Sequence, residues 1–101
     1  MQKPLLAQSH RVVTLVDSNL REQDLHVASA RLEAGAKTIQ PDLVRQWRDG
    51  LGREIAHAKG ALAYVRWDKA MILTGLARET GMNARQRRLG RGLFEVRIRV
   101  S

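Results

Sequence analysis

The stretch LFEVRIRV, residues 93–100, decides the fold that this sequence predicts. From Phe94 onward apolar and charged residues alternate strictly, with Phe94, Val96, Ile98 and Val100 on one side and Glu95, Arg97 and Arg99 on the other. A period of two is typical of a β-strand that buries one face and exposes the other. We therefore predict a strand here, whose arginine face adds to the basic surface of the protein.

A strand needs a neighbouring strand to satisfy its backbone hydrogen bonds, and three neighbours are open to this one. The first is RVVTLV, residues 11–16, which is rich in β-branched residues, although PLLAQSHRVVTLV also partly fits a helical face. The second is ALAYVRW, residues 61–67. The third is the same strand of a second copy across a two-fold axis, which predicts a homodimer through residues 93–100.

Residues 61–67 fit two structures. As a strand, they place Leu62, Tyr64 and Arg66 on one face and Ala63, Val65 and Trp67 on the other. As a continuation of the preceding helix, they extend its apolar stripe through Leu62 and Val65. In either structure we expect Trp67 to be a buried anchor rather than an exposed stacking surface.

Two helices are predicted upstream. The first covers about residues 20–34, because Asn19 and Glu22 have the spacing of a capping box and Gly35 provides a stop. The second covers about residues 41–59. It begins with Pro41, and its apolar residues recur every three or four positions, among them Val44, Trp47, Leu51, Ile55 and Ala58.

These elements predict an α+β fold with two principal helices and a small antiparallel sheet that includes residues 93–100. The 101 residues suffice for a single small domain, 1–101, in which residues 1–10 are expected to be loosely ordered.

Charge is the bulk property that bears most on function. The formal net charge is +8 and the isoelectric point about 11.3. Residues 41–101 hold thirteen Lys or Arg against six Asp or Glu, a net charge of +7. An excess of this kind indicates a polyanionic partner, and arginine is well suited to phosphate and to guanine edges. We expect a nucleic acid, DNA rather than RNA.

LARETGMN, residues 76–83, resembles the end of the first helix and the turn of a helix-turn-helix, as in many bacterial repressors and antitoxins. Ala77 and Gly81 have the spacing of the small residue and the glycine in that family, and Met82 stands at its apolar position. The resemblance implies a second helix over residues 84–93, capped by Asn83, whose arginines reach a major groove. The alternative is a helix that ends near Thr80 on a glycine cap, followed by a basic loop.

Under both interpretations the basic residues near the carboxyl end of the sequence form the predicted nucleic-acid-binding site. They are Arg78, Arg85, Arg87, Arg88, Arg91, Arg97 and Arg99, and the polar residues Asn83 and Gln86 are predicted to join them in the site. Most of them are clustered in NARQRRLGRG, residues 83–92, which has no acidic residue.

No catalytic constellation is recognisable, so we predict no catalytic residues, no metal site and no cofactor. The sequence has no cysteine. Glu54 and His57 have an i, i+3 spacing that carboxylate-bridged metal sites use, but such sites need further carboxylates from other helices. No signal peptide or membrane span is apparent, and the absence of cysteine makes the cytoplasm the expected location.

The function that the sequence favours is a small, non-enzymatic nucleic-acid-binding protein of bacterial or phage type, such as a transcriptional or mobile-element accessory factor. It would hold phosphates through its arginine cluster. The alternative is a protein-interaction subunit or phage-type inhibitor that docks on a larger acidic partner.

Overall fold

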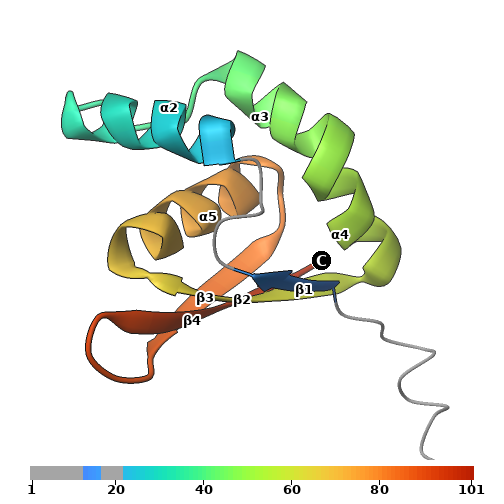
Figure 1. Ribbon diagram of the computed structural model, residues 1–101. Helices are drawn as coiled ribbons and strands as arrows, with labels where there is room; N and C mark the ends of the chain where they lie inside the picture. Colours follow the sequence, from blue (N-terminus) through green and yellow to red (C-terminus); the bar gives the residue numbers. More distant parts are fainter. Residues whose placement is uncertain (1–12, 17–21) are drawn as a thin grey trace, which may run out of the picture.

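The computed structural model describes residues 13–16 and 22–101, so the expected disorder of residues 1–10 and the cap at Asn19 lie outside the described residues. The elements, in chain order, are β1 (Val13–Val16), α2 (Glu22–Glu33), α3 (Pro41–Trp47), a π-helical turn η2 (Arg48–Gly52), α4 (Arg53–Ala58), β2 (Gly60–Arg66), α5 (Trp67–Glu79), β3 (Asn83–Arg88) and β4 (Leu93–Arg99) (Figure 1). The predicted α+β class is confirmed.

The four strands form one sheet in the order β1-β2-β4-β3. β4 runs antiparallel to both of its neighbours, and β1 runs parallel to β2. Of residues 61–67, for which the sequence allowed a helix or a strand, 61–66 thus belong to β2 and Trp67 begins α5. β4 pairs on both sides within its own chain, so its backbone has no free edge for a second copy. The predicted homodimer through residues 93–100 therefore cannot form by strand pairing at β4.

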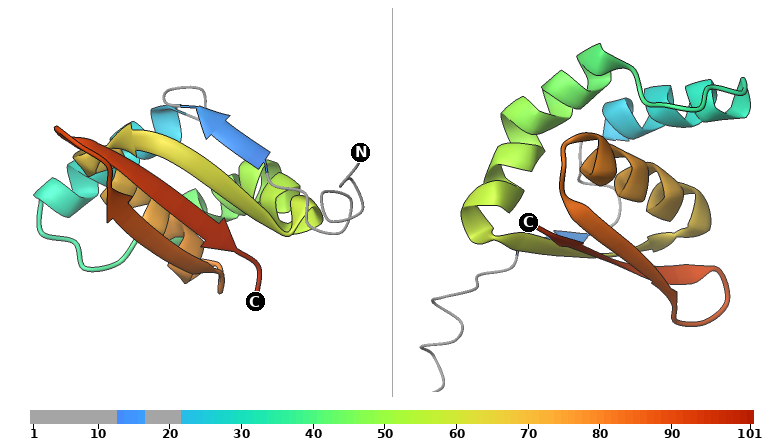
Figure 2. Two further views of the ribbon diagram at one scale, coloured as in Figure 1. Left: turned by 90° about the horizontal axis from the view of Figure 1, so that it is seen from below. Right: turned by 180° about the vertical axis from the view of Figure 1, so that it is seen from behind.

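All described helices lie on the same side of the sheet (Figure 1). α5 lies directly on the sheet, α2 crosses above α5, and the continuous helix made by α3, η2 and α4 descends towards β2. Seen from the opposite side, the strands are in front and no described helix covers them (Figure 2, left). The sheet therefore has one covered face and one open face.

The alternation of β2 and β4 accounts for this two-layer arrangement. Their inward residues are apolar and almost fully buried: Ala61, Ala63, Val65, Val96 and Ile98. On the helix side they meet Leu73 and Leu76 of α5, both without exposed surface. Alanines on β2 leave room for the helices to approach, and burial of the larger side chains supplies the main stabilising free energy.

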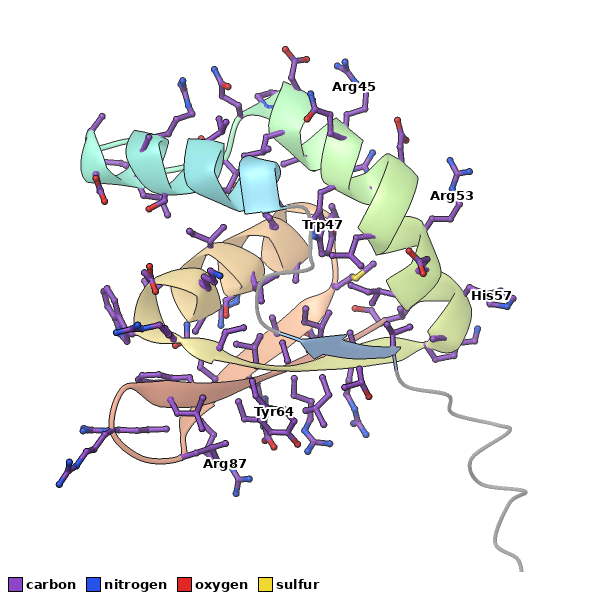
Figure 3. All side chains as sticks on the ribbon, in the orientation of Figure 1. Arg45, Trp47, Arg53, His57, Tyr64 and Arg87 are labelled. Carbon is purple, nitrogen blue, oxygen red and sulfur yellow. The ribbon has the colours of Figure 1, made fainter. Side chains whose placement is uncertain are left out.

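The helix predicted over residues 41–59 extends from Pro41 to Ala58. Its predicted apolar stripe is buried, and Trp47 is only 1% exposed, as expected of a core residue. Trp47 points from the end of α3 into the interior of the molecule (Figure 3). Gly52 leaves the space that the indole fills, because a Cβ there would lie 3.1 Å from its ring. Trp67, by contrast, is 56% exposed at the start of α5, so the expectation of a buried anchor was wrong.

α5 ends at Glu79, beside Thr80, where the alternative to the helix-turn-helix placed the helix end. The basic loop that this alternative expected next was wrong, because Asn83–Arg88 is a strand. Gly81 has a φ of +84°, a conformation that favours glycine. Its N–H donates to the carbonyl of Arg78 at 3.0 Å, and the N–H of Met82 donates to that of Ala77 at 2.9 Å. This pair of hydrogen bonds is a Schellman motif, so the spacing of Ala77 and Gly81 reflects a glycine-capped helix end.

The second helix expected over residues 84–93 does not form, because Asn83–Arg88 is strand β3. This segment has only one buried residue, Ala84, and no apolar alternation. Its extended conformation comes from pairing with β4 along its whole length. A short loop closes the hairpin, where the N–H of Leu89 donates to the carbonyl of Leu93 at 2.8 Å.

The first residue of β2 offers a direct test of the packing. A Cβ on Gly60 would lie 2.8 Å from the carbonyl oxygen of Ile98, which belongs to the paired strand. We expect Gly60→Ala to lower the free energy of unfolding by about 1–3 kcal/mol, because the two backbones must move apart. Urea denaturation measures the change. Gly90→Ala is the control, since a Cβ at Gly90 meets nothing within 4 Å, and equal stability of the two variants would contradict this account.

Candidate functional site

The open face of the sheet concentrates arginine side chains. Alternation places outward on this face Arg66 of β2, Arg85 and Arg87 of β3, and Arg97 and Arg99 of β4. All five are exposed. Figure 3 shows Arg87 and Tyr64 pointing away from the helices on this side. We call these five residues the arginine face.

One carboxylate lies among them. Glu95 is only 8% exposed, and its Oε1 is 3.4 Å from Nη2 of Arg87 and 3.6 Å from Nη2 of Arg97. A carboxylate shared by two guanidinium groups neutralises only one of them. Glu95 thus orients two arginines and leaves the face with a net charge of +4.

Strand register brings two arginines directly opposite each other. Arg85 of β3 is the partner of Arg97 on β4, and in the next row Asn83 faces Arg99. Arg85 and Arg97 line two adjoining shallow hollows, one shared with Arg87 and Glu95 and the other with Asn83 and Arg99. Like charges opposite each other destabilise a sheet, so stability does not explain this pair.

The predicted site residues divide between several locations. Asn83, Arg85, Arg87, Arg97 and Arg99 come together on the open face. Gln86 and Arg88 alternate with them and point to the other side of β3, where Nε2 of Gln86 donates to the sulfur of Met71 at 3.5 Å.

Two further predicted residues lie away from the open face. The guanidinium of Arg78, on α5, donates to the carbonyl of Ala84 at 3.1 Å and so ties the end of the helix to β3. Arg91 lies in the hairpin loop between β3 and β4, at the end of the sheet.

The sequence prediction of the site omitted two residues that the open face contains. Tyr64 and Arg66 project from β2 on the same side as the arginines of β3 and β4. The strand interpretation of residues 61–67 already placed them together, but the register with β4 was needed to join that face to the arginine cluster.

The helical layer and the sheet differ in net charge. Apart from Glu95, each acidic residue whose side chain is described belongs to a helical segment: Glu33, Asp42, Asp49, Glu54, Asp68 and Glu79. Some of these residues pair locally, as Asp42 does with Arg45 at 3.1 Å and Asp49 with Arg53 at 4.0 Å. The same segments hold as many basic residues: Arg31, Arg45, Arg48, Arg53, Lys69 and Arg78. Their charges therefore balance, whereas the sheet carries a net positive charge.

Within the described ranges, no three or more His, Asp or Glu side chains are grouped closely enough to hold a metal ion. His57 projects outward from α4 (Figure 3). None of the described helices combines the length and the apolar character needed to cross a bilayer. Comparison of the chain with protein-family models, curated proteins and solved structures found no match.

The opposed pair Arg85–Arg97 predicts an unusual effect of mutation on stability. Arg85→Thr removes the repulsion and introduces a β-branched residue, so we expect the free energy of unfolding to rise by about 0.2–1 kcal/mol. Urea denaturation at low ionic strength measures it. Arg85→Lys keeps the charge and should leave stability near that of the wild type. A threonine variant less stable than the wild type would contradict the repulsive character of the pair.

Proposed function

We propose that the protein is a nucleic-acid-binding protein and that the arginine face of its sheet holds the phosphates. This proposal rests on one observation: five exposed arginines from three strands lie together on the uncovered face of the sheet. Among its described residues this face has a single acidic side chain, that of Glu95. The charge distribution supports it, because this face accounts for half of the formal net charge of +8.

The chemistry of the side chains favours phosphate as the ligand. Arginine presents a planar fork of N–H donors that binds two phosphate oxygens at once, and it remains charged at any physiological pH. Alternate residues on one strand are about 6.5–7 Å apart, and neighbouring strands are about 4.8 Å apart. Such a grid offers successive phosphates of a chain several positions to bind. Arg66, Arg85 and Arg99 make no ion pair with a described residue and are free to do so.

Salt dependence tests the proposal quantitatively. With about four or five phosphates neutralised, the logarithm of the binding constant should fall with the logarithm of salt concentration with a slope of about −3 to −4.5. Fluorescence anisotropy of labelled oligonucleotides, measured between low and moderate salt, gives this slope. An affinity that does not change with salt, or no binding at low salt, would contradict the proposal and favour an acidic protein as the partner.

A pair of double variants locates the binding surface. Arg85→Gln/Arg97→Gln removes two charges from the arginine face, and we expect it to weaken binding and to reduce the magnitude of the salt slope by about 2. Arg45→Gln/Arg53→Gln removes the same charge from α3 and α4, where both side chains point outward (Figure 3). This control should bind like the wild type. If both double variants lose affinity equally, net charge rather than the sheet face determines binding.

A further inference from the structure

The open face also has an apolar part that phosphate binding does not use. Tyr64 is 42% exposed and Leu93 is 43% exposed, and both point to the same side as the arginines. Tyr64 is paired with Glu95, and Leu93 with Arg66, in adjacent rows of the same two strands. Leu62, half-buried, precedes Tyr64 on this face. We call Leu62, Tyr64 and Leu93 the apolar strip.

The pairing of β2 with β4 places the apolar strip beside charged residues. Leu62 faces Arg97 across the strands, and Arg66 follows Tyr64 on β2. Guanidinium groups therefore lie on more than one side of an exposed phenol ring. This arrangement suits a ligand in which flat apolar groups alternate with anionic groups, as bases do with phosphates.

The width of the sheet favours a single-stranded nucleic acid over a duplex as the ligand. Four strands span three gaps of about 4.8 Å, or about 14 Å, before the side chains are added. The major groove of DNA is about 12 Å wide and admits one helix or a two-stranded ribbon. The open face is thus too broad to enter a groove, and Tyr64, which lies on the inner strand β2, would not reach a stacked base in a duplex. A single strand can lay unpaired bases on such a surface.

Building on the proposed function, we infer that the open face binds single-stranded nucleic acid, with one base stacked on the ring of Tyr64 and the flanking phosphates held by the arginine face. Stacking of a base on an aromatic side chain strengthens binding without selecting a particular base. The site therefore takes single strands of many sequences.

The test compares the binding of oligonucleotides with and without bases. A labelled thymidine oligonucleotide of about ten nucleotides, an abasic chain of equal length and a duplex of equal length are titrated by fluorescence anisotropy at low and at moderate salt. We expect the wild type to bind the thymidine chain roughly five- to 100-fold more tightly than the abasic chain, and more tightly than the duplex. A uridine RNA of the same length, titrated in parallel, distinguishes the two sugars, and preferential binding to either single strand supports the inference.

Two variants test whether the ring of Tyr64 causes the preference for the chain with bases. Tyr64→Phe keeps the ring and should keep the preference for the chain with bases. Tyr64→Leu keeps an apolar side chain and should abolish this preference while leaving the affinity for the abasic chain unchanged. Circular dichroism checks that both variants fold.

The results that would overturn stacking on Tyr64 differ from those that would overturn the proposed function. Equal affinity of the wild type for the thymidine and abasic chains, with a steep salt dependence, would overturn stacking on Tyr64 and leave phosphate binding standing. Tighter binding to the duplex would likewise overturn the inference. No binding to any of the chains at low salt would overturn the proposed function as well.

Discussion

Pairing of β4 with strands on both sides is the constraint on which the rest of the structure depends. β4 joins β2, and through it β1, to β3, so the four strands form one sheet. Its alternation then determines the two layers. Val96 and Ile98 must face the helices to be buried, and Arg97 and Arg99 consequently face the other way. The alternation of side chains along β4 thus produces both the buried core and the arginine face.

The arrangement has a cost in stability on the open face. Arg85 and Arg97 lie opposite each other, and Glu95 compensates only part of the positive charge of its neighbours. A sheet selected for stability alone would alternate charges of opposite sign across its strands. Binding of a polyanion would relieve this repulsion, which links the stability of the protein to occupancy of the face.

Much of the fold follows from local patterns in the sequence. Strict alternation predicted β4 and its outward residues, because the direction of a side chain in a strand depends only on local geometry. The stripe from Val44 to Ala58 predicted the long helix for the same reason. Residues 61–67 stayed ambiguous, since short apolar runs fit either period, and their role as β2 depends on pairing with β4.

Other features could not be predicted, because they arise from tertiary pairing. NARQRR has almost no apolar content, and only the hairpin with β4 makes it a strand. This pairing separates Arg87 from Arg88 and brings Arg85 to Arg97. Composition identified the arginines as a group, but register decided which of them share a surface and which, like Arg78, hold the backbone in place.

The central position of β4 also governs when the chain can fold during its synthesis. β2 is made before β3 and β4 and has only the parallel β1 beside it until Leu93–Arg99 is complete. The covered face lacks Val96 and Ile98 until then, and α5 has no finished sheet to lie on. Nascent chains shorter than this therefore expose the apolar side of β2 and α5, a state that favours aggregation. The sheet is therefore completed only after Leu93–Arg99 has emerged from the ribosome, because β4 is the strand that joins β2 to β3.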